Sequence, residues 1–237
     1  MADLPISERG HAHPELLAET GWLAEHANDD SVRIIDARPT DQYDEGHISG
    51  AVSLPGMGLY GADGSVEIPN VREFREVAAS VGVDDETTVV VYDNAGPPAG
   101  RVAWAFMYYG HRDTRLLDGG LAKWLAEGRD LSTDSDSYEA GAFAPRPQEG
   151  LYCGLDLAKS RVGETGTVIW DVRGSDEYDG SNTRGNPEGR AGHIAGAVNL
   201  NWTSLIDQDS RTLKPAEELR ELLSGIGVTP ESEVVSY

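Results

Sequence analysis

The chain carries the same two charged residues twice, each time two positions apart. Asp36 and Arg38 follow one apolar run, and Asp171 and Arg173 follow another. A carboxylate and a guanidinium at this spacing can pair with each other, and the guanidinium can also bind a small anion. The second pair could therefore serve a functional loop at a strand end. Its repetition in both copies equally favours a purely structural tie, and the sequence leaves both roles open.

Two further arginines lie in an insertion that only the second copy contains, S-N-T-R-G-N-P-E-G-R-A. They are Arg184 and Arg190. The planar guanidinium matches the oxygens of a small anion, and in a chain of formal charge −22 such an anion would need cations gathered locally. We expect Arg190, just before a G-H-I segment, to contribute more than Arg184. The alternative is a solvated surface role.

Histidine and cysteine offer weaker signals. His47 and His193 each stand in G-H-I-x-G-A-V, and their presence in both copies favours a structural role over chemistry. The other histidines show no ligand spacing, so no metal site is expected. The single cysteine, Cys153, excludes an internal disulfide. Its apolar neighbours favour a small, partly buried thiol over a nucleophile.

Composition limits the classes of partner. Of 237 residues, 41 are Asp or Glu and 19 are Lys or Arg, only three of them lysine. This charge disfavours nucleic-acid binding and is typical of proteins that stay soluble in concentrated salt, although an ordinary acidic protein remains the alternative. No apolar run approaches the roughly 20 residues of a membrane-spanning helix, and the first residues lack a signal-peptide pattern. We expect a cytoplasmic protein without membrane partners.

The chain also repeats itself over longer distances. Residues 32–55 resemble 167–180 and 192–201, and residues 80–94 resemble 224–237. Continuous apolar runs that alternate with helical patterns predict parallel sheets buried on both faces. The predicted organisation is a first domain over 1–130, a polar linker over 131–150 and a second domain over 151–237.

The motifs D-x-R, G-H-I-x-G-A-V and L-L-D-G-G-L-x-K-W, in this order, resemble the rhodanese family in its tandem form, and more closely its thiosulfate sulfurtransferases. The resemblance implies an α/β fold with two rhodanese-like doubly wound parallel-sheet domains, the second incomplete. It implies transfer of sulfur from thiosulfate, through a cysteine persulfide, to cyanide or another thiophilic acceptor. No cofactor is implied.

The resemblance also places the nucleophile. In such enzymes the strand that corresponds to E-V-V-S-Y runs directly into the catalytic cysteine, which is expected immediately after Tyr237. Asp93 and Asn94 stand at that place in the first copy, which is therefore expected to be inactive. Residues 1–237 are expected to be a truncated and inactive part of the enzyme. Truncation further predicts reduced burial of Val234 and Val235.

The site residues implied for the donor are Asp171, Arg173 and Arg190. Many relatives carry an arginine where this chain has Glu177, and this departure leaves the anion site less defined. Three other functions remain open: a 3-mercaptopyruvate sulfurtransferase, a non-catalytic binding module on the same fold, and a phosphatase on a related fold, which has the least support. The segment around Gly96, Pro97 and Pro98 does not match a phosphate-binding loop, because proline lacks the required N–H.

Overall fold

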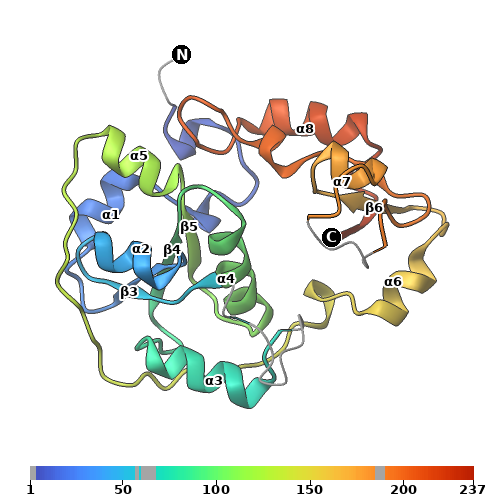
Figure 1. The fold of residues 1–237 in the computed structure, drawn as a ribbon. Coiled ribbons are helices and arrows are strands. Elements are labelled where there is room, and N and C mark those ends of the chain that lie inside the picture. Colours follow the sequence, from blue (N-terminus) through green and yellow to red (C-terminus); the bar gives the residue numbers. More distant parts are fainter. Residues whose placement is uncertain (1–3, 57–58, 60–67, 185–189) are drawn as a thin grey trace. The chain divides into compact units, whose positions relative to one another are not determined.

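The computed structural model describes residues 4–56, 59, 68–184 and 190–237, which form two compact units. Unit 1 comprises Met1–Leu151 together with Gln208–Thr212. Unit 2 comprises Tyr152–Asp207 and Leu213–Tyr237. Figure 1 shows the elements of both units.

Unit 1 is built on a parallel sheet. Its strand order is β1-β5-β4-β2-β3, and every neighbouring pair is parallel. The apolar runs that predicted strands form the centre of this sheet, and all five residues of β2 are buried. The strands are β1 (Leu17–Ala18), β2 (Val32–Asp36), β3 (Ala51–Ser53), β4 (Thr88–Tyr92) and β5 (Thr114–Leu117).

Helices cover both faces of this sheet, as predicted for a doubly wound fold. Val89 and Val91 of β4 belong to one apolar cluster, whereas Val90 and Tyr92 belong to the other, because successive strand residues face opposite sides. The first cluster includes side chains of α3 and α4, and the second includes side chains of α1, α2 and α5. The helices are α1 (Thr20–His26), α2 (Thr40–Glu45), α3 (Val71–Ser80), α4 (Pro97–Tyr108) and α5 (Gly120–Ala126), with short 3-10 turns η1 (Ile6–Glu8), η2 (Pro14–Leu16) and η4 (Glu149–Leu151).

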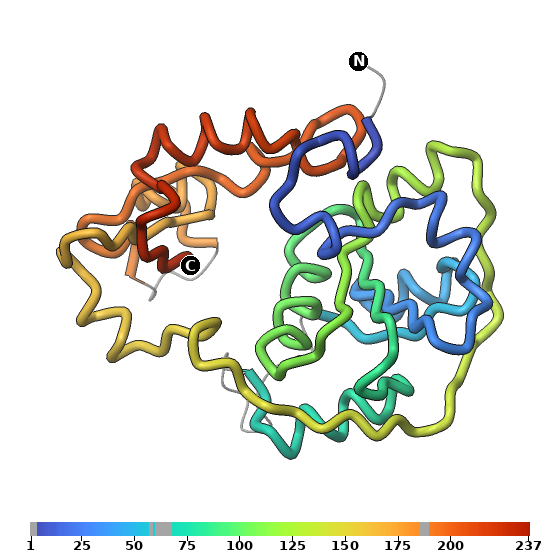
Figure 2. The backbone as a smooth tube through the Cα atoms, turned by 180° about the vertical axis from the view of Figure 1, so that it is seen from behind, coloured from blue at the N-terminus to red at the C-terminus, as the bar shows by residue number. Residues whose placement is uncertain are grey.

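The segment predicted as a linker, residues 131–150, lies along unit 1 and past α3 (Figure 2). Its backbone is tied to unit 1 where Gly141 N–H donates to Ala79 O at 3.1 Å and Phe143 N–H donates to Val83 O at 3.2 Å. The Phe143 side chain is buried in the first apolar cluster. This segment therefore contributes to the core of unit 1.

Unit 2 repeats the middle of the first sheet. Its parallel strands β6 (Thr167–Asp171), β7 (Val198–Asn199) and β8 (Glu233–Ser236) have the order β7-β6-β8, which matches β3-β2-β4 in unit 1. Val234 is 39% exposed and Val235 is 9% exposed, whereas their counterparts Val89 and Val90 in unit 1 are 0% exposed, so burial of the last strand is reduced as expected, although Val235 still packs with Ile169. The helices are α6 (Leu155–Arg161), α7 (Ser175–Asp179), α8 (Ala216–Gly225) and the 3-10 turn η5 (Trp202–Leu205).

The two units also share a glycine turn after the helix that precedes β4 in unit 1 and β8 in unit 2. Gly82 follows α3 and Gly227 follows α8, with φ of 68° and 85°. This left-handed backbone suits glycine, which has no Cβ, and it ends each helix in the same way. Among the described residues, no helix has the length and apolarity needed to cross a membrane.

Candidate active site at the strand ends of unit 2

The second D-x-R pair lies at the carboxyl edge of the unit 2 sheet. Asp171 is the last residue of β6 and is fully buried, and Tyr237 follows the neighbouring strand β8. The carboxyl ends of parallel strands meet at one edge, which is where open α/β sheets place their functional groups. The sequence therefore brings these two residues together through parallel pairing of β6 with β8.

Arg173 is held tightly by Asp171. Its Nε donates to Asp171 Oδ1 at 2.9 Å and its Nη2 donates to Oδ2 at 2.5 Å, while its backbone N–H donates to Oδ1 at 3.0 Å. Nη2 also donates to the carbonyl of Gly192 at 3.0 Å. Burial favours a higher pKa for Asp171, but these hydrogen bonds outweigh it and hold the pKa below its ordinary value. The hydrogen bond with Asp171 raises the pKa of Arg173.

Tyr237 completes this network. Its hydroxyl accepts a hydrogen bond from Ile194 N–H at 2.9 Å and is also hydrogen-bonded to Asp171. The guanidinium carbon of Arg173 lies 5.2 Å from the centre of the Tyr237 ring. The strand end of β8 is thus joined to both members of the D-x-R pair.

Unit 1 contains the same network. Arg38 Nε donates to Asp36 at 3.0 Å and Nη2 donates at 2.5 Å, and the Tyr92 hydroxyl donates to Asp36 Oδ2 at 2.6 Å. Ile48 N–H donates to the Tyr92 hydroxyl at 3.1 Å. Because both units have this arrangement, its common role is to fix the strand edge to the G-H-I segment. Any chemistry specific to unit 2 must come from what surrounds the network.

The histidines of the two G-H-I segments pack in the same way. His47 stacks on Tyr43 with ring centres 3.8 Å apart, and His193 stacks on Tyr178 at 3.7 Å. Each Nδ1 is hydrogen-bonded to the carbonyl of its stacking tyrosine, at 2.8 and 2.7 Å. His47 is fully buried, whereas His193 is exposed. These contacts account for the repeated histidine by packing.

A small pocket of unit 2 lies beside the network. Its volume is about 200 Å³, below the roughly 300–1,000 Å³ of pockets for drug-sized ligands, so it suits a small ion. Arg173 and Arg190, both predicted for the site, line it, whereas Asp171 is not part of the lining and acts on the pocket through Arg173. Arg190 is exposed, and in the described part of the chain its side chain forms no hydrogen bond or ion pair. Among the residues that the structure describes, the lining is formed by Arg173, Glu177, Asn182, Thr183, Arg184, Arg190, Ala191 and Gly192.

Sequence reasoning did not foresee the pairing of Glu177 with Arg184. Glu177 is only 7% exposed, and its Oε2 accepts a hydrogen bond from Arg184 Nη2 at 2.6 Å. The only signal in the sequence was a glutamate in a short helix followed by an arginine in the insertion. Arg184 thus lines the same pocket as Arg190, which we had expected to contribute more.

Cys153 lies elsewhere. It is partly buried and packs against the apolar cluster of Ile169, Ala197 and Val235. Its thiol lies 3.9 Å from the carbonyl of Gly154, as a donor. It does not line the pocket.

In unit 1, the loop after β4 binds the carboxylate of Asp93 through backbone N–H groups. Asp93 directly follows β4, is 4% exposed, and accepts hydrogen bonds from Gly96 N–H at 2.6 Å and Ala99 N–H at 2.8 Å. Burial raises the pKa of Asp93, and the backbone donors oppose this increase. Backbone N–H groups at the start of α4 thus hold the carboxylate side chain that directly follows β4, the strand of unit 1 that corresponds to β8.

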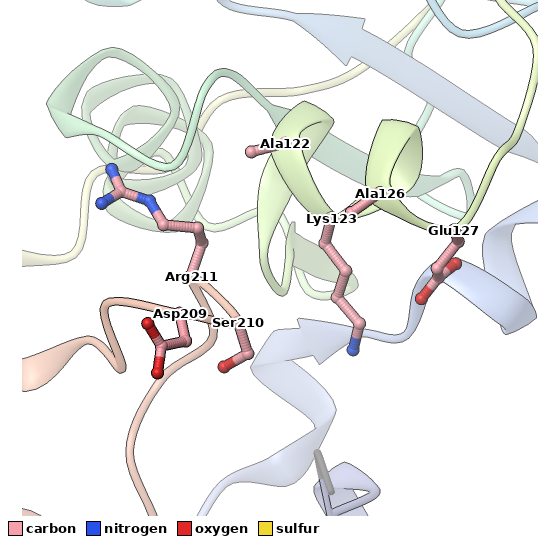
Figure 3. A pocket seen from close by; sticks show the side chains of 7 residues that line it. All are labelled: Ala122, Lys123, Ala126, Glu127, Asp209, Ser210 and Arg211. Atoms are coloured by element: carbon pink, nitrogen blue, oxygen red, sulfur yellow. The ribbon is translucent and has the colours of Figure 1, made fainter. Parts of the chain in front are cut away.

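Unit 1 has a larger pocket of about 460 Å³ (Figure 3). The charged residues of its lining are two cations and two anions: Lys123 of α5, Glu127 directly after α5, and Asp209 and Arg211 of the 208–212 segment. This balance gives no preference for an anion. Among the described residues, no group of three or more His, Cys, Asp or Glu side chains is placed to hold a metal ion.

Comparison with known proteins agrees with the geometry. The chain is 36% identical over 241 residues to the sulfur carrier protein TtuD of Thermus thermophilus, covering 96% of this chain and 84% of that protein. It is 30% identical to a putative thiosulfate sulfurtransferase of Saccharopolyspora erythraea, covering 94% and 81%. The structure of SseA from Escherichia coli, described as a 3-mercaptopyruvate sulfotransferase, matches with a TM-score of 0.83 at 26% identity and covers 93% of this chain and 87% of that one. The model of the rhodanese-like domain matches residues 19–127 and 155–237, and the chain therefore belongs to the rhodanese-like domain family.

Proposed function

We propose that this protein is a thiosulfate sulfurtransferase whose nucleophile is a cysteine at the position after Tyr237. The observation that carries the proposal is the arginine-lined pocket of unit 2, because Arg173 both lines it and contacts Tyr237. The names of the relatives from Thermus thermophilus and Saccharopolyspora erythraea support sulfur transfer as the reaction class.

The proposed reaction has two steps. The cysteine thiolate attacks the outer sulfur of thiosulfate, a cysteine–sulfur bond forms, the sulfur–sulfur bond of thiosulfate breaks, and sulfite leaves with the electron pair. Cyanide or another thiophilic acceptor then attacks the outer sulfur of the persulfide, and the thiolate leaves. The nucleophile must be a thiolate, which backbone N–H groups after the strand would stabilise, as those of Gly96 and Ala99 do for Asp93.

Each site residue has a distinct proposed role. Arg190 is an exposed cation of the lining and binds the sulfonate oxygens of the donor. The Nε and Nη2 donors of Arg173 already bind Asp171 and the Gly192 carbonyl. Arg173 therefore contributes positive electrostatic potential and forms part of the pocket wall. Asp171 keeps Arg173 and Tyr237 in place.

The test is a thiosulfate:cyanide assay on the protein expressed from its complete gene. We expect thiocyanate formation, loss of activity on alkylation, and a mass increase of one sulfur atom after treatment with thiosulfate alone. Arg190→Ala should raise KM for thiosulfate. No thiocyanate and no persulfide would favour instead a non-catalytic binding module on the same fold.

A second donor has specific support. The match to SseA at 26% identity makes 3-mercaptopyruvate the competing sulfur donor. Its carboxylate would use the same pocket arginines. The ratio of kcat/KM for thiosulfate and for 3-mercaptopyruvate decides between the two donors.

The formal charge of −22 leads us to propose that the protein works in the salt-rich cytoplasm of its cell and does not bind nucleic acid. Screening of mutual repulsion by salt should stabilise the folded state. Thermal unfolding in increasing KCl should therefore show a rising Tm. A Tm that is independent of salt would contradict adaptation to salt.

A further inference from the structure

Glu177 presents a problem for an anion pocket. It is a nearly buried carboxylate in the first turn of α7, and it lines the pocket that the proposed donor would enter. A buried carboxylate without a partner would repel an anionic donor and would itself be costly to ionise. Its partner is Arg184, whose side chain is 74% exposed while that of Glu177 is 9% exposed.

The backbone around Arg184 is also fixed onto α7. Asn182 N–H donates to the carbonyl of Asp176 at 3.0 Å, and the Asn182 side-chain amide donates to the Asp176 carboxylate at 2.7 Å. Arg184 N–H then donates to Asn182 Oδ1 at 2.8 Å, and Arg184 has a left-handed φ of 49°. The turn at 182–184 thus holds the start of the Arg184 side chain, and Glu177 holds its end.

This geometry leaves the guanidinium available to a ligand. One of its nitrogens, Nη2, is bonded to Glu177, and the side chain is mostly exposed at the pocket lining. A guanidinium has five N–H donors, so further donors remain for a second anion. The hydrogen bond with Glu177 also raises the pKa of Arg184, which stays charged.

We propose that Glu177 is a positioning residue that orients Arg184 for the anionic sulfur donor, so that Arg184 and Arg190 bind it together. The inference rests on the proposed function, whose donor is a small sulfur oxyanion. A free arginine side chain samples many rotamers, and fixing it in one of them on binding costs conformational entropy. If Glu177 already holds Arg184 in that rotamer before the donor binds, part of this cost is removed. Glu177 therefore favours anion binding although it is itself negatively charged.

The direction in which one substitution changes the affinity for the donor distinguishes this positioning role from a purely electrostatic one. Glu177→Gln removes a negative charge from the pocket, so a purely electrostatic role predicts tighter binding of a dianion. A positioning role predicts weaker binding, because the amide lacks the charge that holds the guanidinium.

The experiment is calorimetric titration of the full chain with thiosulfate at fixed ionic strength. We expect Arg184→Gln to weaken binding about tenfold, as for one charge-assisted hydrogen bond. Glu177→Gln should weaken it about fivefold. The double variant should bind no more weakly than Arg184→Gln alone, because the two residues act as one unit. Arg184→Lys keeps the charge but not the planar donors, so its affinity for thiosulfate should lie between that of the unaltered protein and that of Arg184→Gln.

The matched control is Arg161→Gln. Arg161 is another arginine of unit 2 that pairs with a glutamate, Glu164 at 2.9 Å, and it does not line the pocket. Its replacement should leave the Kd unchanged, and circular dichroism confirms folding of each variant. Unchanged or tighter binding by Glu177→Gln overturns the inference. If that happens while the unaltered protein still binds thiosulfate and transfers sulfur, the proposed function holds and only the positioning role of Glu177 is refuted. If the unaltered protein does not bind thiosulfate, both the proposed function and the positioning role are refuted.

Discussion

The carboxylate of Asp93 accepts a hydrogen bond from the backbone N–H of Ala99 at 2.8 Å, across the turn between β4 and α4. A second bond, from Gly96 N–H, is 2.6 Å long. The first unit therefore uses an aspartate as a fixed anion at the start of its longest described helix, where the partial positive charge of the helix is greatest.

Asp93→Ala should destabilise unit 1 by about 2 kcal/mol, because the buried N–H of Ala99 and the partly buried N–H of Gly96 lose a charged acceptor. Asp93→Asn keeps one acceptor and should cost less. The free energy of unfolding of each variant is measured by urea unfolding and, separately, by native-state hydrogen exchange in β4. The neighbouring Asn94→Ala serves as the control and should change stability by less than about 0.5 kcal/mol. Equal stability of Asp93→Ala and the unaltered protein would show that the turn does not depend on the carboxylate.

Asp171 should make the stability of unit 2 depend on pH. Its pKa in the folded state is lowered, against burial, by the hydrogen bonds from Arg173. The unfolded chain then binds more protons than the folded one as pH falls through the ordinary value of 3.8, so the stabilisation is present above this pH and is lost below it. We expect Asp171→Asn to cost about 2 kcal/mol at pH 7 and less at pH 3, because the stabilisation is lost progressively as pH falls from 3.8 through the lower pKa of the folded state.

The control for this pH dependence is Asp156→Asn, since the Asp156 side chain is fully exposed and pairs only at 3.6 Å with Lys159. Chemical unfolding at both pH values compares the two variants. A stability difference for Asp171→Asn that stays constant between pH 7 and pH 3 would contradict the assigned hydrogen-bond network.

The two histidines offer a matched comparison within one molecule. His47 is fully buried and its Nε2 is hydrogen-bonded to the carbonyl of Asp134 at 2.8 Å, whereas His193 is exposed. We expect His47→Ala to destabilise unit 1 by about 3 kcal/mol, because it leaves a cavity and unpaired carbonyls, and His193→Ala to cost about 1 kcal/mol in unit 2. Hydrogen exchange in β2 and in β6 reports the two effects separately. Equal costs would mean that stacking on tyrosine, and not burial, dominates.

These residues also show how far sequence reasoning extends. The apolar runs predicted β2, β4 and β6, because a buried parallel strand needs no more than a continuous apolar segment. The repeated histidine predicted a structural role, but its different burial in the two units did not follow. His47 is covered by residues 131–150, through its bridge to Ser132, and that segment has no periodic pattern.

The pocket shows the same limit. The arginines were identified by type and position, since few cations exist in this acidic chain. The pairing of Glu177 with Arg184 depends on a left-handed residue and on Asn182 contacting Asp176. Such a turn is specified by local hydrogen bonds, which hydrophobic periodicity does not report.

Cys153 should be dispensable for sulfur transfer. Its thiol donates to the Gly154 carbonyl at 3.9 Å, and it packs against the cluster that contains Ile169 and Val235. A nucleophilic cysteine needs the opposite surroundings, with N–H donors or cations that stabilise the thiolate. Cys153→Ser should therefore keep kcat and KM for thiosulfate while changing stability by about 1 kcal/mol or less. Abolished thiocyanate formation in Cys153→Ser, with folding intact, would assign the nucleophile to Cys153 and refute its proposed place after Tyr237.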